Sequence, residues 1–163
     1  MPGVELYLSL GSNLGDRKEN IINALRLVES KLGVPAKAVS SFYETEPWGF
    51  ESDDMFLNAA AAYSLDLPEG YDAGQEGKRI LAVCKEVESA LGRTSPAEYD
   101  GSGRRIYKSR TIDVDILFLG YEAIDCEELT VPHKLMSQRD FVLVPLSEII
   151  SSDMREHFKV IFE

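Results

Sequence analysis

The pattern of hydrophobic and polar positions divides the chain into six predicted elements. Leu6, Leu8 and Leu10 alternate with Tyr7 and Ser9, which is the period of a strand with one buried face. Two other stretches repeat apolar residues at helical spacing and are followed by glycine, as helices often are. In chain order the pattern predicts a strand at 4–10, a helix at 16–32, strands at 39–45 and 56–67, a helix at 80–91 and a strand within 110–120.

The order of these elements predicts the fold class. Strand, helix, strand, strand, helix, strand is the order of a ferredoxin-like βαββαβ core in the α+β class, with a four-stranded, mostly antiparallel sheet, two helices on one face and short C-terminal elements. Residues 56–67 are rich in alanine, which favours a helix, but their large side chains alternate, and we therefore predict a strand. Residues 68–77 are polar and contain glycine, which indicates a loop or a frayed helix start. The 163 residues fit one domain spanning 1–163.

Two acidic residues interrupt the last predicted strand. Asp113 and Asp115 are separated by one residue, so in a strand both side chains point to the same face, ~7 Å apart. Two like charges at that distance repel each other unless a cation holds them. Mg²⁺ suits such a site because it binds one or two carboxylates together with water and phosphate oxygens. The alternative is structural: the acids cap a strand end or pair with nearby arginines.

A basic, irregular segment leads directly into this strand. Residues 93–109 contain Gly101 and Gly103 and, with Arg110, carry the cations Arg93, Arg104, Arg105 and Lys108. A segment of this length without its own regular structure is more often functional or disordered than inert. Arginines and a lysine next to two aspartates have the composition of a lid that closes over phosphates.

Three later or isolated residues add candidate chemistry. His133 follows Pro132 in a polar loop, and Arg139 lies shortly after it. A single histidine is commonly structural, but these neighbours make contact with a phosphate an equal alternative. Metal ions, arginines and a lid are the components that phosphoryl-type transfer needs. Trp48, the only tryptophan, lies in the predicted loop 46–54, either as a lid over the core or as a contact for a flat ligand.

Charge and composition narrow the possible partners and compartment. The formal net charge of −11 argues against binding to nucleic acid or to an anionic membrane. Cys84 and Cys126 have no metal-ligand spacing and are interpreted as reduced thiols of a cytoplasmic protein. No apolar run approaches the roughly 20 residues that span a bilayer, and the first residues do not have the pattern of a signal peptide. Neither a Walker loop nor a dinucleotide-binding fingerprint is present.

Seven short segments between residues 4 and 149 carry a family resemblance. They are LSLGSNLG at 8–15, SSFYETEP at 40–47, FLNA at 56–59, GR at 92–93, RTIDVDIL at 110–117, LTVPH at 129–133 and RDF at 139–141. In this order they closely resemble 6-hydroxymethyl-7,8-dihydropterin pyrophosphokinase of folate synthesis. The resemblance implies transfer of pyrophosphate from ATP to the hydroxymethyl group of the dihydropterin, with AMP as the other product.

The resemblance also implies a role for each matching residue. It implies two Mg²⁺ ions on Asp113 and Asp115, and catalytic roles for Arg93, Arg110 and Asp115, the last as a possible acceptor of the hydroxyl proton. The implied ATP-binding residues are Glu88, Arg93, Arg110, Ile116 through its backbone, Thr130, His133 and Arg139. The implied pterin-binding residues are Thr45, Pro47, Trp48, Phe56, Asn58 and Phe141, with the two phenylalanine rings enclosing the pterin. We expect a monomer that binds ATP and the dihydropterin and has no nucleic acid or membrane partner.

Some positions depart from the family pattern. Phe56 stands where tyrosine is common, and Tyr107 stands where some members have tryptophan. The basic segment is longer than in compact members, which leaves open which of Arg104, Arg105 and Lys108 reaches a phosphate. The tail after Ile150 lacks the usual proline-containing ending. Two other functions compete with the resemblance: a Mg²⁺-dependent phosphohydrolase, and a non-catalytic ferredoxin-like binding module.

Overall fold

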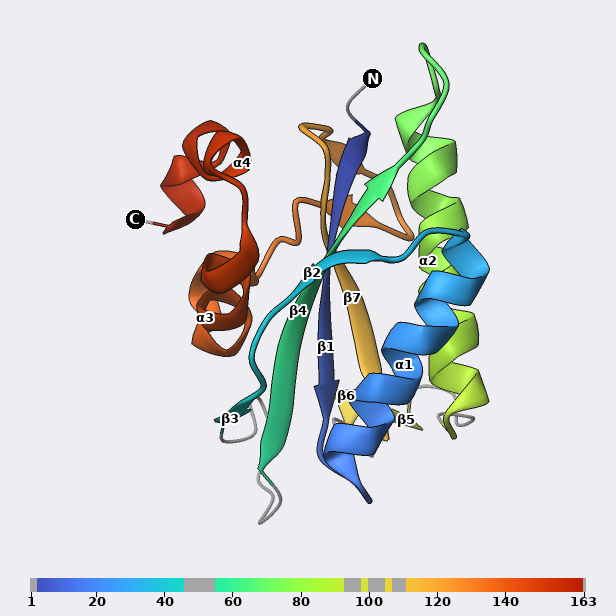
Figure 1. The fold of residues 1–163 in the computed structure, drawn as a ribbon, viewed down its shortest axis with the longest axis vertical. Helices are drawn as coiled ribbons and strands as arrows, with labels where there is room; N and C mark the ends of the chain where they lie inside the picture. The colour runs from blue at the N-terminus through green and yellow to red at the C-terminus, as the bar shows by residue number, and fades with distance from the viewer. Residues whose placement is uncertain (1–2, 46–54, 93–97, 100–104, 107–110, 163) are drawn as a thin grey trace.

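The chain forms a central antiparallel sheet with helices on both faces (Figure 1). The structure is a computed structural model that describes residues 3–45, 55–92, 98–99, 105–106 and 111–162. The sheet contains β1 (Val4–Ser12), β2 (Ala36–Val39), β3 (Tyr43–Thr45), β4 (Phe56–Leu65) and β7 (Asp113–Leu119). Its order is β2-β4-β1-β7, with β3 also pairing with β4, and every pair is antiparallel. This order confirms the predicted ferredoxin-like arrangement.

The predicted strand at 39–45 is two strands, β2 and β3, which separate at Ser40. The Ser40 hydroxyl donates to Ser41 O at 2.8 Å and accepts from Ala60 N at 2.8 Å, while Ser40 N donates to Ala60 O at 2.9 Å. The Ser40 hydroxyl thus takes the place of a backbone carbonyl as the acceptor for Ala60 N of β4. The chain bends at Ser40 while both pieces stay attached to the same neighbouring strand, and the sheet has five strands instead of four.

Two long helices cover one face of the sheet. Helix α1 (Arg17–Leu32) begins at Asp16, whose side chain accepts from Glu19 N, and ends at Gly33 with φ 77°. Helix α2 (Ala73–Ala90) begins where Asp72 accepts from Gln75 N. Both helices pack on the leucines of β1 and on the alternate residues of β4 and β7. The prediction of helices on this face is confirmed. Helix α2 starts before the apolar pattern at residue 80, so residues 73–77 are a helix start, the second of the two alternatives for this polar segment.

The C-terminal part of the chain covers the second face. It contains the 3-10 turns η1 (Met136–Gln138) and η2 (Lys159–Phe162) and the helices α3 (Asp140–Ile149), with Pro145 inside it, and α4 (Ser152–His157). Tyr7 and Phe118 are buried beneath this layer together with Leu146 and Met154. The expectation that β1 has a single buried face is therefore incomplete, because both of its faces are covered.

Two small hairpins complete the described structure. Strands β5 (Glu98–Tyr99) and β6 (Arg105–Ile106) pair with each other within the basic segment. Strands β8 (Ile124–Asp125) and β9 (Thr130–Val131) form the second hairpin, and the peptide bond between Val131 and Pro132 is cis. Within the described ranges, no helix has the length and apolar character needed to cross a membrane.

An irregularity in β7 determines which of its side chains face each layer. Tyr7 lies opposite Phe118, but Leu8 lies opposite Ile116, so Leu117 is an extra residue in the pairing. Leu117 and Phe118 consequently both join the second-face core, although they are adjacent in sequence. Before this bulge the alternation is regular, with Val114 and Ile116 facing α1 and α2.

Candidate functional site

The two aspartates lie on the sheet face that α3 covers. Val114 and Ile116 point to the opposite core, so Asp113 and Asp115 point away from it on one shared face, as their spacing predicts. Asp113 lies opposite Gly11 of β1, and Asp115 lies opposite Ser9. Both aspartates are partly exposed. The arrangement leaves the two carboxylates within reach of a ligand at the end of the sheet.

Gly11 separates the aspartates from an amide on the next strand. Asn58 of β4 lies opposite Gly11 on its other side, which gives the cross-strand row Asn58, Gly11, Asp113. A Cβ atom on Gly11 would lie 3.1 Å from Asn58 Oδ1 and 3.6 Å from Phe56 Cδ1. The bare glycine therefore gives room for these two side chains. The predicted strand ended at residue 10, whereas β1 continues through Gly11 to Ser12, and an isolated glycine in a strand is a signal for close approach.

The Asn58 side chain is held in one orientation. Its nitrogen Nδ2 donates to Thr45 Oγ1 at 2.7 Å and lies 3.4 Å from Tyr43 O, so its carbonyl oxygen turns toward Gly11. Asn58 is buried, with 3% of its surface exposed. Three predicted pterin-binding residues, Thr45, Phe56 and Asn58, thus come together where β3 pairs with β4.

Glu88 lies behind the aspartates instead of beside them. It is on α2, only 7% exposed, and its Oε2 accepts a 2.9 Å hydrogen bond from Val114 N. Val114 is the residue between Asp113 and Asp115, so this carboxylate holds the peptide that joins them. Glu88 was expected to bind ATP. In the structure its carboxylate also holds β7, the strand that carries the two aspartates.

His133 is anchored to β7 by its backbone. His133 N donates to Leu117 O at 3.3 Å, and the ring atom Nδ1 accepts from Leu135 N at 3.3 Å. An accepting Nδ1 places the ring proton on Nε2, which can then donate to a ligand. Burial lowers the pKa of His133, the positive charge of Arg139 lowers it further, and Asp113 opposes both effects. The neutral ring is therefore favoured, and the charges of Arg139 and Asp113 both reach it.

Arg139 and Phe141 are in contact at the start of α3. The Arg139 guanidinium carbon lies 5.6 Å from the centre of the Phe141 ring, a cation–π distance. Arg139 occupies the N-cap position of the helix, and Phe141 packs partly against the second-face core. The contact joins a residue predicted to bind ATP to a residue predicted to bind the pterin.

Of the other four predicted ATP residues, Ile116 and Thr130 are within the described structure. Ile116 is 3% exposed and its side chain belongs to the core, so only its backbone can meet a ligand. Thr130 is in β9 and pairs with Asp125 of β8. Four predicted residues, Pro47, Trp48, Arg93 and Arg110, lie outside the described residues, as do Arg104, Tyr107 and Lys108.

Metal binding would need ligands besides the two aspartates. In the part of the chain that the structure describes, no group of three or more histidine, cysteine, aspartate or glutamate side chains could hold an ion by itself. Asp113 and Asp115 alone suit Mg²⁺, which keeps several waters and takes phosphate oxygens from its substrate.

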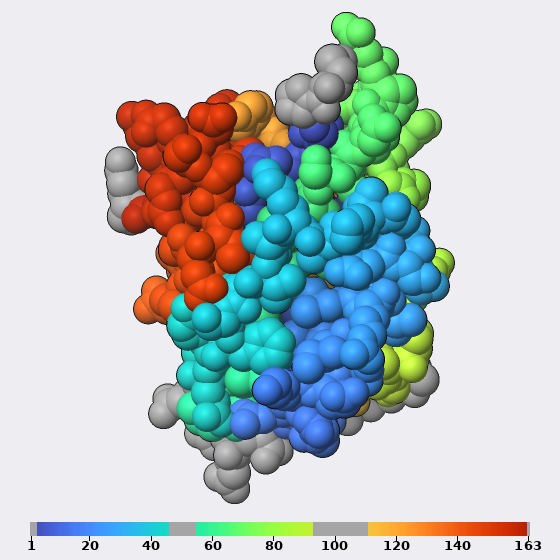
Figure 2. Space-filling view, in the orientation of Figure 1, coloured from blue at the N-terminus to red at the C-terminus, as the bar shows by residue number. Residues whose placement is uncertain are grey.

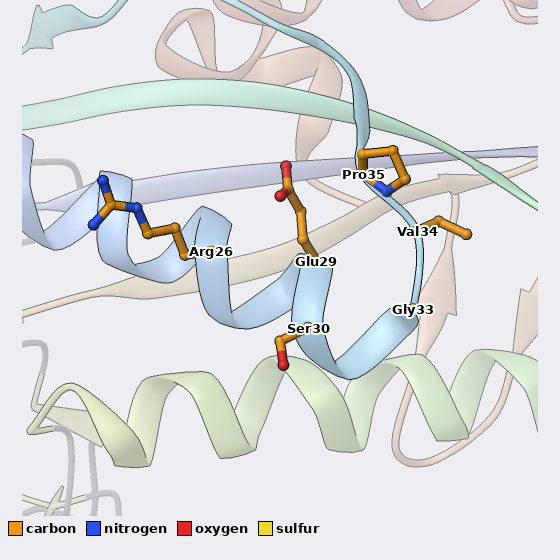
Figure 3. Close-up of a pocket in the computed structure, with 6 residues that line it drawn as sticks. All are labelled: Arg26, Glu29, Ser30, Gly33, Val34 and Pro35. Atoms are coloured by element: carbon orange, nitrogen blue, oxygen red, sulfur yellow. The ribbon is translucent and has the colours of Figure 1, made fainter.

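A shallow hollow elsewhere on the molecule does not coincide with this site. It lies at the end of α1 and is lined by Arg26, Glu29, Ser30, Gly33, Val34 and Pro35 (Figure 3). Glu29 Oε1 accepts from Ala36 N at 3.0 Å, which closes the turn into β2. The hollow follows from the way that helix α1 ends.

Comparison with known proteins adds an independent observation. The family model described as 7,8-dihydro-6-hydroxymethylpterin-pyrophosphokinase matches residues 7–151. The chain is 42% identical over 145 residues to a 2-amino-4-hydroxy-6-hydroxymethyldihydropteridine pyrophosphokinase of Porphyromonas gingivalis, covering 88% of this chain and 89% of that protein. It is 36% identical over 150 residues to the protein of the same name in Bacillus subtilis, covering 92% and 80%.

The fold has a counterpart among solved structures. A crystal structure of an HPPK-DHPS in complex with substrates matches with a TM-score of 0.61 at 12% identity, covering 98% of this chain and 43% of that one. At this identity the match supports the fold alone.

Proposed function

The chain belongs to the 7,8-dihydro-6-hydroxymethylpterin-pyrophosphokinase family, and we propose from this premise how its residues carry the reaction. The enzyme transfers pyrophosphate from ATP to the hydroxymethyl group of 6-hydroxymethyl-7,8-dihydropterin in folate synthesis. The products are AMP and the dihydropterin pyrophosphate. The hydroxyl oxygen therefore bonds to the β-phosphorus of ATP, and the bond from that phosphorus to the oxygen retained by AMP breaks.

One observation carries the assignment of residues: the cross-strand row of Asn58, Gly11 and Asp113. It places an amide that can read a heterocycle edge and an acid that can hold a metal on one sheet face, two strands apart. The side-chain-free glycine lies between them. A pterin at Asn58 would thus direct its hydroxymethyl group toward the acids without obstruction from β1.

Asp113 and Asp115 are proposed to hold two Mg²⁺ ions together with the ATP phosphates. Bound Mg²⁺ would neutralise phosphate charge and bring the phosphorus and the hydroxyl oxygen together. Glu88 keeps the peptide between the two aspartates in place from the other side of the sheet. Asp115 is further proposed to accept the proton that the hydroxyl group loses.

His133 and Arg139 are proposed to contact ATP. The Nε2 proton of His133 and the guanidinium of Arg139 can both donate to phosphate oxygens. Arg93 and Arg110 are assigned from the family resemblance to the phosphates and to the charge that develops in the reaction. Ile116 would contribute backbone atoms near the adenine, and Thr130 would complete the nucleotide contacts.

Phe56 and Phe141 are proposed to enclose the pterin ring. A flat heterocycle suits stacking between two aromatic side chains, and its donor and acceptor edge suits a fixed amide. Asn58 supplies the carbonyl oxygen that faces Gly11, and its nitrogen is held by Thr45. Pro47 and Trp48 are assigned to the same pocket from the resemblance.

The test is incubation with ATP, Mg²⁺ and 6-hydroxymethyl-7,8-dihydropterin, with AMP followed by chromatography. AMP should form only when the dihydropterin is present, in equal amount to the pterin pyrophosphate. Release of phosphate without the pterin would instead support a phosphohydrolase. We further propose a monomeric, cytoplasmic enzyme with no nucleic acid or membrane partner, which light scattering of the purified protein and cell fractionation would check.

A further inference from the structure

Glu148 joins α3 to the link between β2 and β3. Its Oε2 accepts from Ser41 N at 2.6 Å, and its Oε1 accepts from the Tyr43 hydroxyl at 2.6 Å. Each carboxylate oxygen thus has its own donor, and hydrogen bonds to an ionised acceptor are stronger than neutral ones. The Tyr43 bond lowers the pKa of Glu148 and raises the pKa of Tyr43. Figure 2 shows the orange-red atoms of α3 packed against the cyan atoms of this link.

The helix that Glu148 anchors also carries Phe141. The two residues are seven positions apart in α3, which is about two turns, so they lie on the same side of the helix. An anchor at Glu148 therefore sets both the rotation of α3 and its distance from β3. It acts on the position of the Phe141 ring without touching it.

The residue that Glu148 holds is also the cross-strand neighbour of Asn58. Tyr43 of β3 lies opposite Asn58 of β4, and its carbonyl oxygen lies 3.4 Å from Asn58 Nδ2. Two residues further along β3, Thr45 accepts from the same nitrogen at 2.7 Å. A continuous set of contacts thus runs from α3 through Tyr43 to the amide proposed to read the pterin.

We propose that Glu148 is a positioning residue for the dihydropterin, holding α3 against β3 so that Phe141 keeps the separation from Asn58 and Phe56 that a flat ring requires. This inference rests on the proposed assignment of those three residues to the pterin. Glu148 itself touches no substrate. Its effect should be larger on the pterin than on ATP, because His133 is anchored separately, by its backbone, to Leu117 of β7, and among the described residues proposed to bind ATP only Arg139, the N-cap residue of α3, would move with the helix.

The experiment compares Glu148→Ala, which removes both bonds, with Tyr43→Phe, which removes one and keeps the ring. The KM values for dihydropterin and for ATP are measured separately, together with the thermal midpoint. Glu148→Ala should raise the dihydropterin KM about tenfold, the effect of losing roughly one charge-assisted hydrogen bond, with the ATP KM within about twofold of wild type. Tyr43→Phe should give a smaller rise in the same parameter. The double variant should be no worse than Glu148→Ala alone, because both changes break the same contact.

Two controls make the result specific. Glu148→Gln can still accept from Ser41 N and can donate to the Tyr43 oxygen, so it should restore most of the dihydropterin affinity. Glu69→Ala removes an exposed glutamate from the turn before α2 and should leave both KM values unchanged. If Glu148→Ala does not fold, Tyr43→Phe decides the question.

Opposite outcomes overturn the inference at different levels. Folded Glu148→Ala and Tyr43→Phe proteins with a wild-type dihydropterin KM would exclude the positioning role while leaving the proposed function intact. Equal rises in the KM values for ATP and dihydropterin would indicate general loosening and would also overturn it. Wild-type protein that makes no AMP from ATP and the dihydropterin would instead overturn the proposed function, and this inference with it.

Discussion

The backbone nitrogen of Val114 lies 2.9 Å from Glu88 Oε2, so a buried carboxylate of α2 holds the strand between Asp113 and Asp115. Replacing Glu88 with alanine would leave the Val114 N–H without this acceptor. We expect a loss of about 1–3 kcal/mol in the free energy of unfolding and a higher KM for Mg²⁺-ATP. Urea unfolding and steady-state kinetics measure the two effects.

Two comparisons test the Glu88 interpretation. Glu88→Gln keeps an oxygen acceptor and should retain more stability than Glu88→Ala. Glu86→Ala removes an exposed residue of the same helix, paired with Lys31 at 3.0 Å, and should cost under about 1 kcal/mol. An unchanged unfolding free energy in Glu88→Ala would contradict a supporting role for this hydrogen bond.

Asp113→Ala should abolish activity while the protein stays folded. Losing a direct metal ligand should cost more than the roughly 10–100-fold that follows loss of an outer partner of a metal ligand. Activity is measured across a Mg²⁺ titration, and folding by circular dichroism. Asp125→Asn, on the exposed turn side of β8, is the matched control and should keep wild-type turnover. Near-normal turnover in Asp113→Ala would refute the metal assignment.

Asp115→Asn separates metal binding from proton transfer. If Asp115 accepts the hydroxyl proton, turnover should fall while Mg²⁺ affinity, measured by calorimetry with ATP present, changes little. A parallel fall in both quantities would leave Asp115 with a metal-binding role only.

Gly11→Ala should weaken dihydropterin binding more than it changes stability. The new methyl carbon would lie 3.1 Å from Asn58 Oδ1, and the Asn58 amide cannot withdraw without losing its 2.7 Å bond to Thr45. We expect a roughly tenfold higher dihydropterin KM and a change in unfolding free energy within about 1 kcal/mol. Gly74→Ala in the first turn of α2 is the control and should leave the KM unchanged. An unaltered dihydropterin KM in Gly11→Ala would show that the glycine is not needed for this pocket.

The pKa of His133 in the free protein should lie below its ordinary value of 6.5, chiefly because of burial. A lowered folded-state pKa means that the unfolded chain takes up the proton first as the pH falls. The stabilising contribution of the neutral ring is therefore present above pH 6.5 and is lost as the pH decreases toward the folded-state value. An NMR titration measures this directly, and His157→Gln leaves a single histidine signal for assignment. A midpoint above 6.5 would contradict the effect of burial.

Tyr63→Phe should be neutral or stabilising. The Tyr63 hydroxyl is fully buried and has no hydrogen-bond partner in the part of the chain that the structure describes, and burial raises its pKa. Removing it should raise the unfolding free energy by up to about 1–2 kcal/mol. Tyr7→Phe is the matched comparison, because the Tyr7 hydroxyl accepts from Ser151 N at 3.0 Å and its loss should cost about 1 kcal/mol. Strong destabilisation by Tyr63→Phe would show that this hydroxyl has a stabilising partner.

Local patterns in the sequence predicted the strands and the shared face of the acids because strand alternation needs no tertiary information. The shared face of Asp113 and Asp115 follows from the two-residue period of a strand, and the start of α1 follows from a capping residue, Asp16. The roles of these residues came from the family resemblance, since an isolated pair of acids is compatible with a structural role.

Features that depend on distant contacts were missed. The glycines in residues 73–77 left a loop and a frayed helix start as alternatives, and the reason for the second glycine is a distant contact: a Cβ atom on Gly77 would lie 2.8 Å from Ile124 Cδ1 and 2.9 Å from Leu129 Cδ2. That glycine allows the β8–β9 hairpin to pack on α2. Ser40 breaks the predicted strand through a bond to Ala60, and Glu148 meets Tyr43 across the fold. None of these contacts leaves a periodic signal.

Because Leu117 is an extra residue in the pairing with β1, the number of residues in β7 is constrained independently of which residues they are. Pairing with β1 directs the first half of β7 toward the proposed metal site, and the bulge lets Leu117 and Phe118 enter the same core. Deletion of Leu117 would restore regular pairing and remove its side chain from the second-face core, whereas deletion of a residue between Asp113 and Ile116 would turn one of the two aspartates toward the core under α1 and α2. Homologous enzymes should therefore differ in this strand by substitutions far more often than by insertions or deletions.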